Sequence, residues 1–72
     1  MKKYVRINVV FREYYDVDAV LEVLDNFSAE AELNGIIRMA IFYGDAERGQ
    51  EFIKAIEKVE PISSITMKTY NY

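Results

Sequence analysis

One stretch decides the fold: residues 34–43, with the sequence NGIIRMAIFY. If Asn34-Gly35 forms a two-residue type I′ turn, both residues have positive φ and a strand lies on either side of them. The sheet then has four strands. If Gly35 instead follows the last residue of a helix, as glycine commonly does, the sheet has only three. The architecture therefore depends on how this dipeptide folds.

The preceding residues, SAEAEL at 28–33, fit both structures. Their composition of strong helix formers favours a helix. Their alternation favours a strand, with Ala29, Ala31 and Leu33 facing inward and Glu30 and Glu32 facing outward. A helix and a strand thus remain alternatives for this segment when it is considered alone.

The other strands favour the turn. Polar residues recur on one face of each of them: Arg6, Asn8, Arg38 and Lys68. Parallel sheets are usually apolar on both faces, whereas antiparallel sheets commonly have one polar face. We therefore favour the hairpin, with Leu33 and Ile36 flanking the turn.

The remaining elements follow from hydrophobic periodicity. Residues 3–11 alternate as a strand. A helix begins after Asp16, which is a good N-cap. A second strand-like run covers residues 36–43, a second helix begins at Asp45 and stops before Pro61, and residues 63–70 form the last strand. Two apolar helical stripes are expected to be buried: Val17, Val20, Leu21, Leu24 and Phe27, and Gly49, Phe52, Ile53, Ile56 and Val59.

This order is β-α-β-β-α-β, which is the ferredoxin-like pattern. The predicted fold is α+β: one domain over residues 1–72, with a four-stranded antiparallel sheet and both helices on one face. Right-handed crossovers place the strands in the order 4-1-3-2.

Composition excludes several kinds of chemistry. The 72 residues include no cysteine and no histidine, so thiolate chemistry and the commonest general base are absent. No motif for a metal, a cofactor or a phosphate loop is present, and we predict a protein that is not an enzyme and holds none of these. No apolar run approaches the ~20 residues of a membrane span, which favours a cytoplasmic protein.

The outer face of the sheet is the strongest candidate for function. In the third strand Ile37, Met39, Ile41 and Tyr43 are assigned to the core, which leaves Ile36, Arg38, Ala40 and Phe42 outside. The candidate interface on this open face is a set of aromatic, apolar and basic residues: Tyr4, Arg6, Val10, Ile36, Arg38, Phe42, Lys68 and Tyr70. Asn8, Thr66 and Tyr72 are expected on the same face. Aromatic residues and arginine are enriched at protein interfaces.

Three segments give the chain a resemblance to the ACT and RAM regulatory domains. They are Val9-Val10-Phe11-Arg12-Glu13 before a helix that opens at Val17, the turn Asn34-Gly35, and residues 56–65, IEKVEPISSI. The resemblance implies a βαββαβ module that binds amino acids or other small effectors at subunit interfaces. In that family the loop after the first strand carries a glycine, whereas residues 13–16 here contain none.

The leading hypothesis is a regulatory module that forms a homodimer through its sheet and binds a small effector at the interface. A second is an acidic modulator of another protein, based on Asp16, Asp18, Glu22 and Asp25 and the net charge of -3. The least favoured is an RNA-binding sheet, since nucleic-acid-binding proteins usually carry a basic surface.

Overall fold

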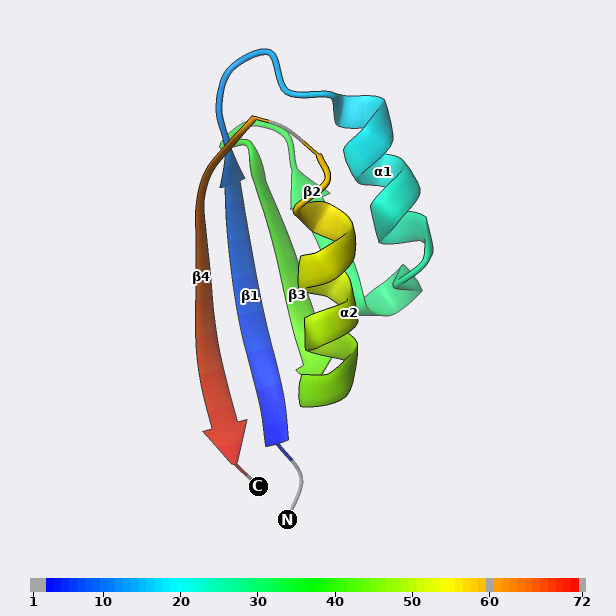
Figure 1. Cartoon of the computed structure of the whole chain (residues 1–72), viewed down its shortest axis with the longest axis vertical. Coiled ribbons are helices and arrows are strands. Elements are labelled where there is room, and N and C mark those ends of the chain that lie inside the picture. The colour runs from blue at the N-terminus through cyan, green and yellow to red at the C-terminus, as the bar shows by residue number, and fades with distance from the viewer. Residues whose placement is uncertain (1–2, 60, 72) are drawn as a thin grey trace.

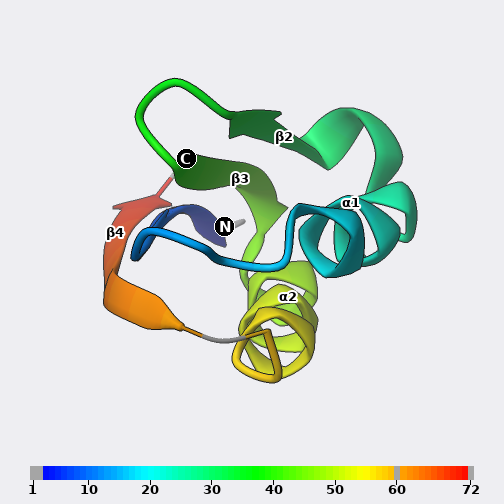
Figure 2. The same ribbon diagram turned by 90° about the horizontal axis from the view of Figure 1, so that it is seen from above.

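The computed structural model describes residues 3–59 and 61–71, without the side chain of Ser28. The elements follow in the order β1 (Lys3–Phe11), α1 (Val17–Asp25), a 3-10 turn (Ser28–Glu30), β2 (Ala31–Asn34), β3 (Met39–Asp45), α2 (Ala46–Ile56) and β4 (Ile62–Asn71). The fold is α+β: four antiparallel strands form an open sheet, and both helices cover one of its faces (Figures 1 and 2).

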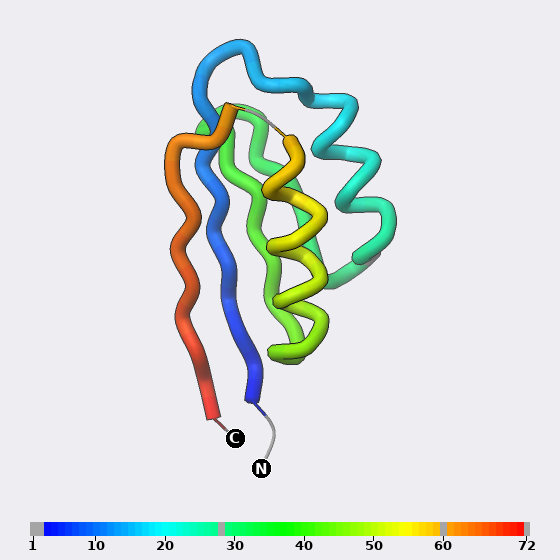
Figure 3. The backbone as a smooth tube through the Cα atoms, in the orientation of Figure 1, coloured from blue at the N-terminus to red at the C-terminus, as the bar shows by residue number. Residues whose placement is uncertain are grey.

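The strands lie in the order β2-β3-β1-β4, which is 4-1-3-2 read from the β4 edge. The central strands are β1 and β3. Figure 3 shows β1 and β4 running side by side, in agreement with a register that extends from Lys3 opposite Asn71 to Phe11 opposite Ile62. α2 packs on β1 and β3, and α1 packs on β2 and α2.

The core lies between the central strands and the helices. β1 contributes Val5, Ile7, Val9 and Phe11, as its alternation predicts. Three phenylalanines fill the centre: Phe27, Phe42 and Phe52 have ring centroids 5.1–5.8 Å apart. Such offset and edge-to-face contacts add to the stabilisation from burial alone.

The predicted orientation of β3 is wrong. Ala40 and Phe42 are fully buried, while Met39 and Ile41 are half-buried and Tyr43 is 47% exposed on the opposite face. The charge of Arg38 favours placing this residue on the outer face, and with it Ala40 and Phe42. β3 begins only at Met39, so Arg38 marks neither face, and a one-residue change in facing moves every side chain of a strand.

The predicted two-residue turn is also wrong, although the hairpin exists. Asn34 pairs with Met39, so the loop contains the four residues Gly35–Arg38. The Asn34 side chain accepts a hydrogen bond from the Ile36 backbone N–H at 3.1 Å, which starts the turn. Arg38, not Gly35, has the left-handed conformation, with φ 52°. Its Nε donates to the Phe11 carbonyl at 3.2 Å, and this contact ties the turn to the end of β1.

The ambiguous segment combines both alternatives. Ser28–Glu30 forms a single 3-10 turn, and the strand begins at Ala31. Ala31 and Leu33 pack against the core and Glu32 points outward, as predicted. Glu30 does not lie on the outer face: its carboxylate binds Arg48 of α2 at 3.2 Å. Arg48 also donates a hydrogen bond to the Glu51 carboxylate at 2.8 Å. The hydrogen bonds to Glu30 and Glu51 raise the pKa of Arg48 above its ordinary value.

Gly35→Ala is expected to leave the protein as stable or to stabilise it by about 0.4–1 kcal/mol. Gly35 has no positive φ, and a Cβ at this position would meet no atom within 4 Å. Alanine therefore restricts the unfolded chain without strain in the folded one. Urea denaturation measures the difference. If the free energy of unfolding fell by more than about 1 kcal/mol, Gly35 would instead have the positive φ of a type I′ turn, in which alanine is strained.

Both helices begin at the predicted caps. Asp16 accepts from the Ala19 N–H at 3.1 Å, and Asp45 accepts from the Glu47 N–H at 2.7 Å. Gly49 lies where α2 crosses β1, and a Cβ there would overlap the Val5 side chain. The buried stripe of α2 is confirmed by Phe52 and Ile56, whereas Val17 and Leu21 of α1 are 42% and 45% exposed. The face of α1 that packs against the core therefore contains Val20, Val23 and Leu24.

Candidate binding surface on the open face of the sheet

The face opposite the helices is arranged in rows across the strands. Its alternate side chains come from β2 (Glu32, Asn34), β3 (Met39, Ile41, Tyr43), β1 (Tyr4, Arg6, Asn8, Val10) and β4 (Ser64, Thr66, Lys68, Tyr70). No helix covers this face within the described part of the chain (Figure 2). We call it the open face.

An apolar strip runs along the centre of the open face and consists of Val10, Met39, Ile41 and Tyr43. Val10 lies directly opposite Met39 in the register. The first three residues are half-buried, and Tyr43 stacks at 6.2 Å on Tyr4. Exposed apolar surface of this kind is common at protein interfaces.

Two cations lie beside the strip. Arg6 of β1 and Lys68 of β4 are directly opposite each other in the register, and both are exposed. We call them the cation pair. Like charges in this position destabilise a sheet. Among residues 3–59 and 61–71, the ion pairs join Arg48 to Glu30 and Glu51, and none reaches the cation pair. Within the described residues, the sheet therefore carries two adjacent positive charges with no carboxylate paired to them.

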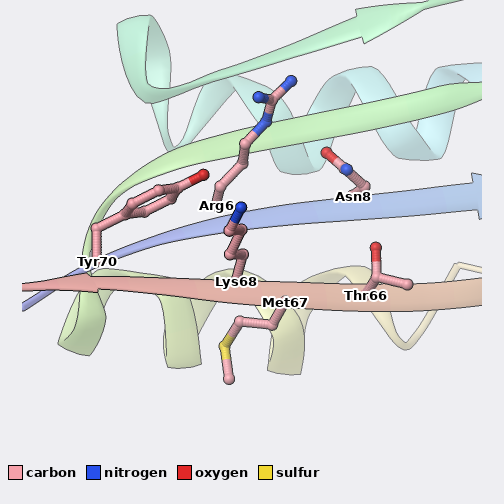
Figure 4. A pocket seen from close by; sticks show the side chains of 6 residues that line it. All are labelled: Arg6, Asn8, Thr66, Met67, Lys68 and Tyr70. Carbon is pink, nitrogen blue, oxygen red and sulfur yellow. The ribbon is translucent and has the colours of Figure 1, made fainter.

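The cation pair lines a cavity of about 380 Å³. Arg6, Asn8, Thr66, Lys68 and Tyr70 point to this side of the sheet, whereas Met67 points to the other (Figure 4). Lys68 Nζ lies 5.5 Å from the centroid of the Tyr70 ring. The Asn8 side-chain oxygen is buried and has no hydrogen-bond partner among the described residues. Since buried polar atoms are normally paired, Asn8 has an unmet hydrogen-bonding need beside this cavity.

The structure brings five of the eight predicted interface residues together on the open face: Tyr4, Arg6, Val10, Lys68 and Tyr70. The prediction is wrong for Phe42, which is in the core, and for Ile36 and Arg38, which lie in the turn at the end of the sheet. Ala40 is likewise buried, and Tyr72 lies outside the described residues. Ile36 and Arg38 line a second cavity, of about 550 Å³, with Tyr14.

Met39, Ile41 and Tyr43 lie on the open face, although the sequence predicts them in the core. One signal favours the correct facing. Phenylalanine has no polar group, whereas tyrosine has an apolar ring and a polar tip and suits a half-exposed position. Phe42 therefore belongs inside and Tyr43 outside, whatever the charge of Arg38 indicates.

The loop after β1 shows how this chain differs from the ACT and RAM pattern. Tyr14 adopts φ 63° and is 97% exposed. A left-handed conformation is unfavourable for a residue of this size. The loop thus contains a conformation that favours glycine without having a glycine.

Other kinds of site are not evident. No cluster of three or more potential metal ligands occurs among the residues that the structure describes. Neither of the two helices described is long and apolar enough to cross a membrane. No known protein family, curated protein or solved structure matches the chain.

Proposed function

We propose that the protein is a non-enzymatic regulatory module of the ferredoxin-like class that pairs with a second copy of itself through the open face. The observation that supports this most is the apolar strip, which lies on the two central strands, on the face that no helix of the described chain covers. A chain of 72 residues buries only about 60% of its unfolded surface. Burial of the strip against a partner would add to this.

The charges on the open face support a second copy as the partner. Glu32 lies on β2 at one flank of the strip, and the cation pair lies on β1 and β4 at the other flank. A two-fold axis parallel to the strands brings Glu32 of each copy toward the cation pair of the other. Isologous dimers are self-complementary in this way, and an effector at the cation pair would compete with Glu32 of the second copy.

Engineered cysteines test this arrangement in a chain that has none of its own. Asn34 and Ser64 lie in one row, on the two edge strands, opposite Met39 and Val10 respectively. Three strand spacings separate them by about 14 Å within one chain, which is too far for a disulfide. The proposed axis brings Asn34 of one copy over Ser64 of the other.

Asn34→Cys/Ser64→Cys is therefore expected to give a covalent dimer on mild oxidation, as seen on a non-reducing gel. Each single variant is the control and is expected to remain largely monomeric, because like positions lie at opposite flanks. Efficient cross-linking of Ser64→Cys alone would show that β4 meets β4 instead. No cross-linking of the double variant would contradict the proposed dimer.

A further inference from the structure

The cation pair and its cavity have chemistry that self-association alone does not explain. Two cations directly opposite on neighbouring strands cost stability. An amide, a hydroxyl and a phenol surround them: Asn8, Thr66 and Tyr70. The volume of about 380 Å³ is in the range of small-molecule sites.

We propose that this cavity binds a small phosphate monoester. A phosphate monoester carries a charge of about -1.5 to -2 at neutral pH, which matches two adjacent cations better than a single carboxylate does. A guanidinium presents a planar fork of donors that fits phosphate oxygens, and lysine adds a point charge. Arg6 supplies the first and Lys68 the second.

The other groups select for the rest of the ligand. The Asn8 side-chain oxygen has no hydrogen-bond partner among the described residues, and a hydroxyl or amine near the phosphate would supply one if the Asn8 side chain turned toward the cavity. The rings of Tyr43 and Tyr70 lie at 6.2 Å from each other beside the cation pair and offer an aromatic surface. A phosphorylated sugar or nucleoside meets both conditions.

The site is formed by one chain and does not require the proposed dimer. If both exist, they compete, since Glu32 of the second copy approaches the same cations. Phosphate is then expected to weaken self-association, and by linkage self-association weakens phosphate binding by the same factor. Binding and oligomeric state are separate measurements, so failure of the dimer leaves the site testable.

The test is an NMR titration of the labelled protein with inorganic phosphate at constant ionic strength. Saturable shifts are expected at the backbone amides of Arg6, Asn8, Thr66 and Lys68. Arg6→Gln and Lys68→Glu should each raise the Kd at least tenfold. Lys54→Glu is the matched control, because it makes the same charge change on an exposed position of α2, and its Kd should stay within twofold.

Lys68→Glu also separates loss of a ligand contact from loss of the fold. It places a carboxylate opposite Arg6, a pairing that stabilises a sheet. The melting temperature is therefore expected to stay the same or rise while phosphate binding is lost. Shifts that do not saturate, or equal Kd values for Lys68→Glu and Lys54→Glu, would overturn the proposal.

Two further probes identify the source of the phosphate. A nucleoside monophosphate is expected to bind at the same amides and more tightly than inorganic phosphate. A single-stranded oligonucleotide of about 10 nucleotides is expected to bind no more tightly than the monophosphate. If the oligonucleotide bound and the monophosphate did not, the small-molecule site would be overturned in favour of a nucleic-acid surface.

Discussion

Phe42→Ala is expected to lower the free energy of unfolding by about 3–5 kcal/mol. Phe42 is fully buried and contacts Phe27 and Phe52 on the helical side of the sheet. Truncation removes a large apolar side chain and leaves a cavity at the centre of the core. Since small domains are only marginally stable, the variant should be largely unfolded at moderate temperature. Urea denaturation followed by circular dichroism measures the loss.

Tyr43→Ala is the matched control on the next residue of β3. Its side chain is 47% exposed on the open face and contacts the rings of Tyr4 and Tyr70, so the expected loss is about 1–2 kcal/mol, clearly below that of Phe42→Ala. The difference between the two variants tests the facing of β3. Equal losses in the free energy of unfolding, or a larger loss for Tyr43→Ala, would contradict the structure. They would indicate that Phe42 lies on the outer face of the sheet.

Much of the fold could be predicted from local patterns. The alternation of β1 and the caps Asp16 and Asp45 gave elements that the structure confirms. The four-stranded antiparallel sheet is also confirmed; of the polar residues that predicted it, Arg6, Asn8 and Lys68 lie on one face of β1 and β4, whereas Arg38 lies in the turn. The turn could not be predicted in detail, because Asn34-Gly35 suits a type I′ turn by composition. Arg38, which has the left-handed conformation, forms hydrogen bonds with Phe11, a residue that is distant in sequence.

The binding surface was predicted for β1 and β4 and missed for β3. In β1 and β4 the polar residues alternate within the strand itself, so they indicate which side chains lie on the outer face of the sheet. In β3 the one charged residue used for the assignment, Arg38, precedes the strand. The register between β1 and β4, which places Arg6 opposite Lys68, cannot be read from either strand alone.

Ile41→Lys is expected to raise the dissociation constant of the proposed dimer about hundredfold. Ile41 lies in the middle of the apolar strip, between Asn8 and Glu32 in the register. Taking a charged group out of water at an apolar interface costs several kcal/mol, even beside an opposite charge, and a hundredfold change corresponds to about 2.7 kcal/mol. The fold should be retained, because the lysine lies directly opposite Glu32 on β2. Sedimentation at several concentrations measures the change.

Ile37→Lys provides the matched control for this substitution. Ile37 is 50% exposed but belongs to the turn, beyond the apolar strip. The same isoleucine-to-lysine change there should leave self-association within about twofold of the unmodified chain, as expected of a surface substitution. Equal weakening by both variants would mean that net charge, not the strip, controls association.

Sedimentation equilibrium of the unmodified protein tests self-association through the open face most directly. Over a range from low micromolar to near-millimolar concentration, the average mass should rise from the 8.4 kDa of one chain toward twice that value. Ile41→Lys should remain near the mass of one chain over the same range. A mass of 8.4 kDa at every concentration of the unmodified protein would contradict the proposed function.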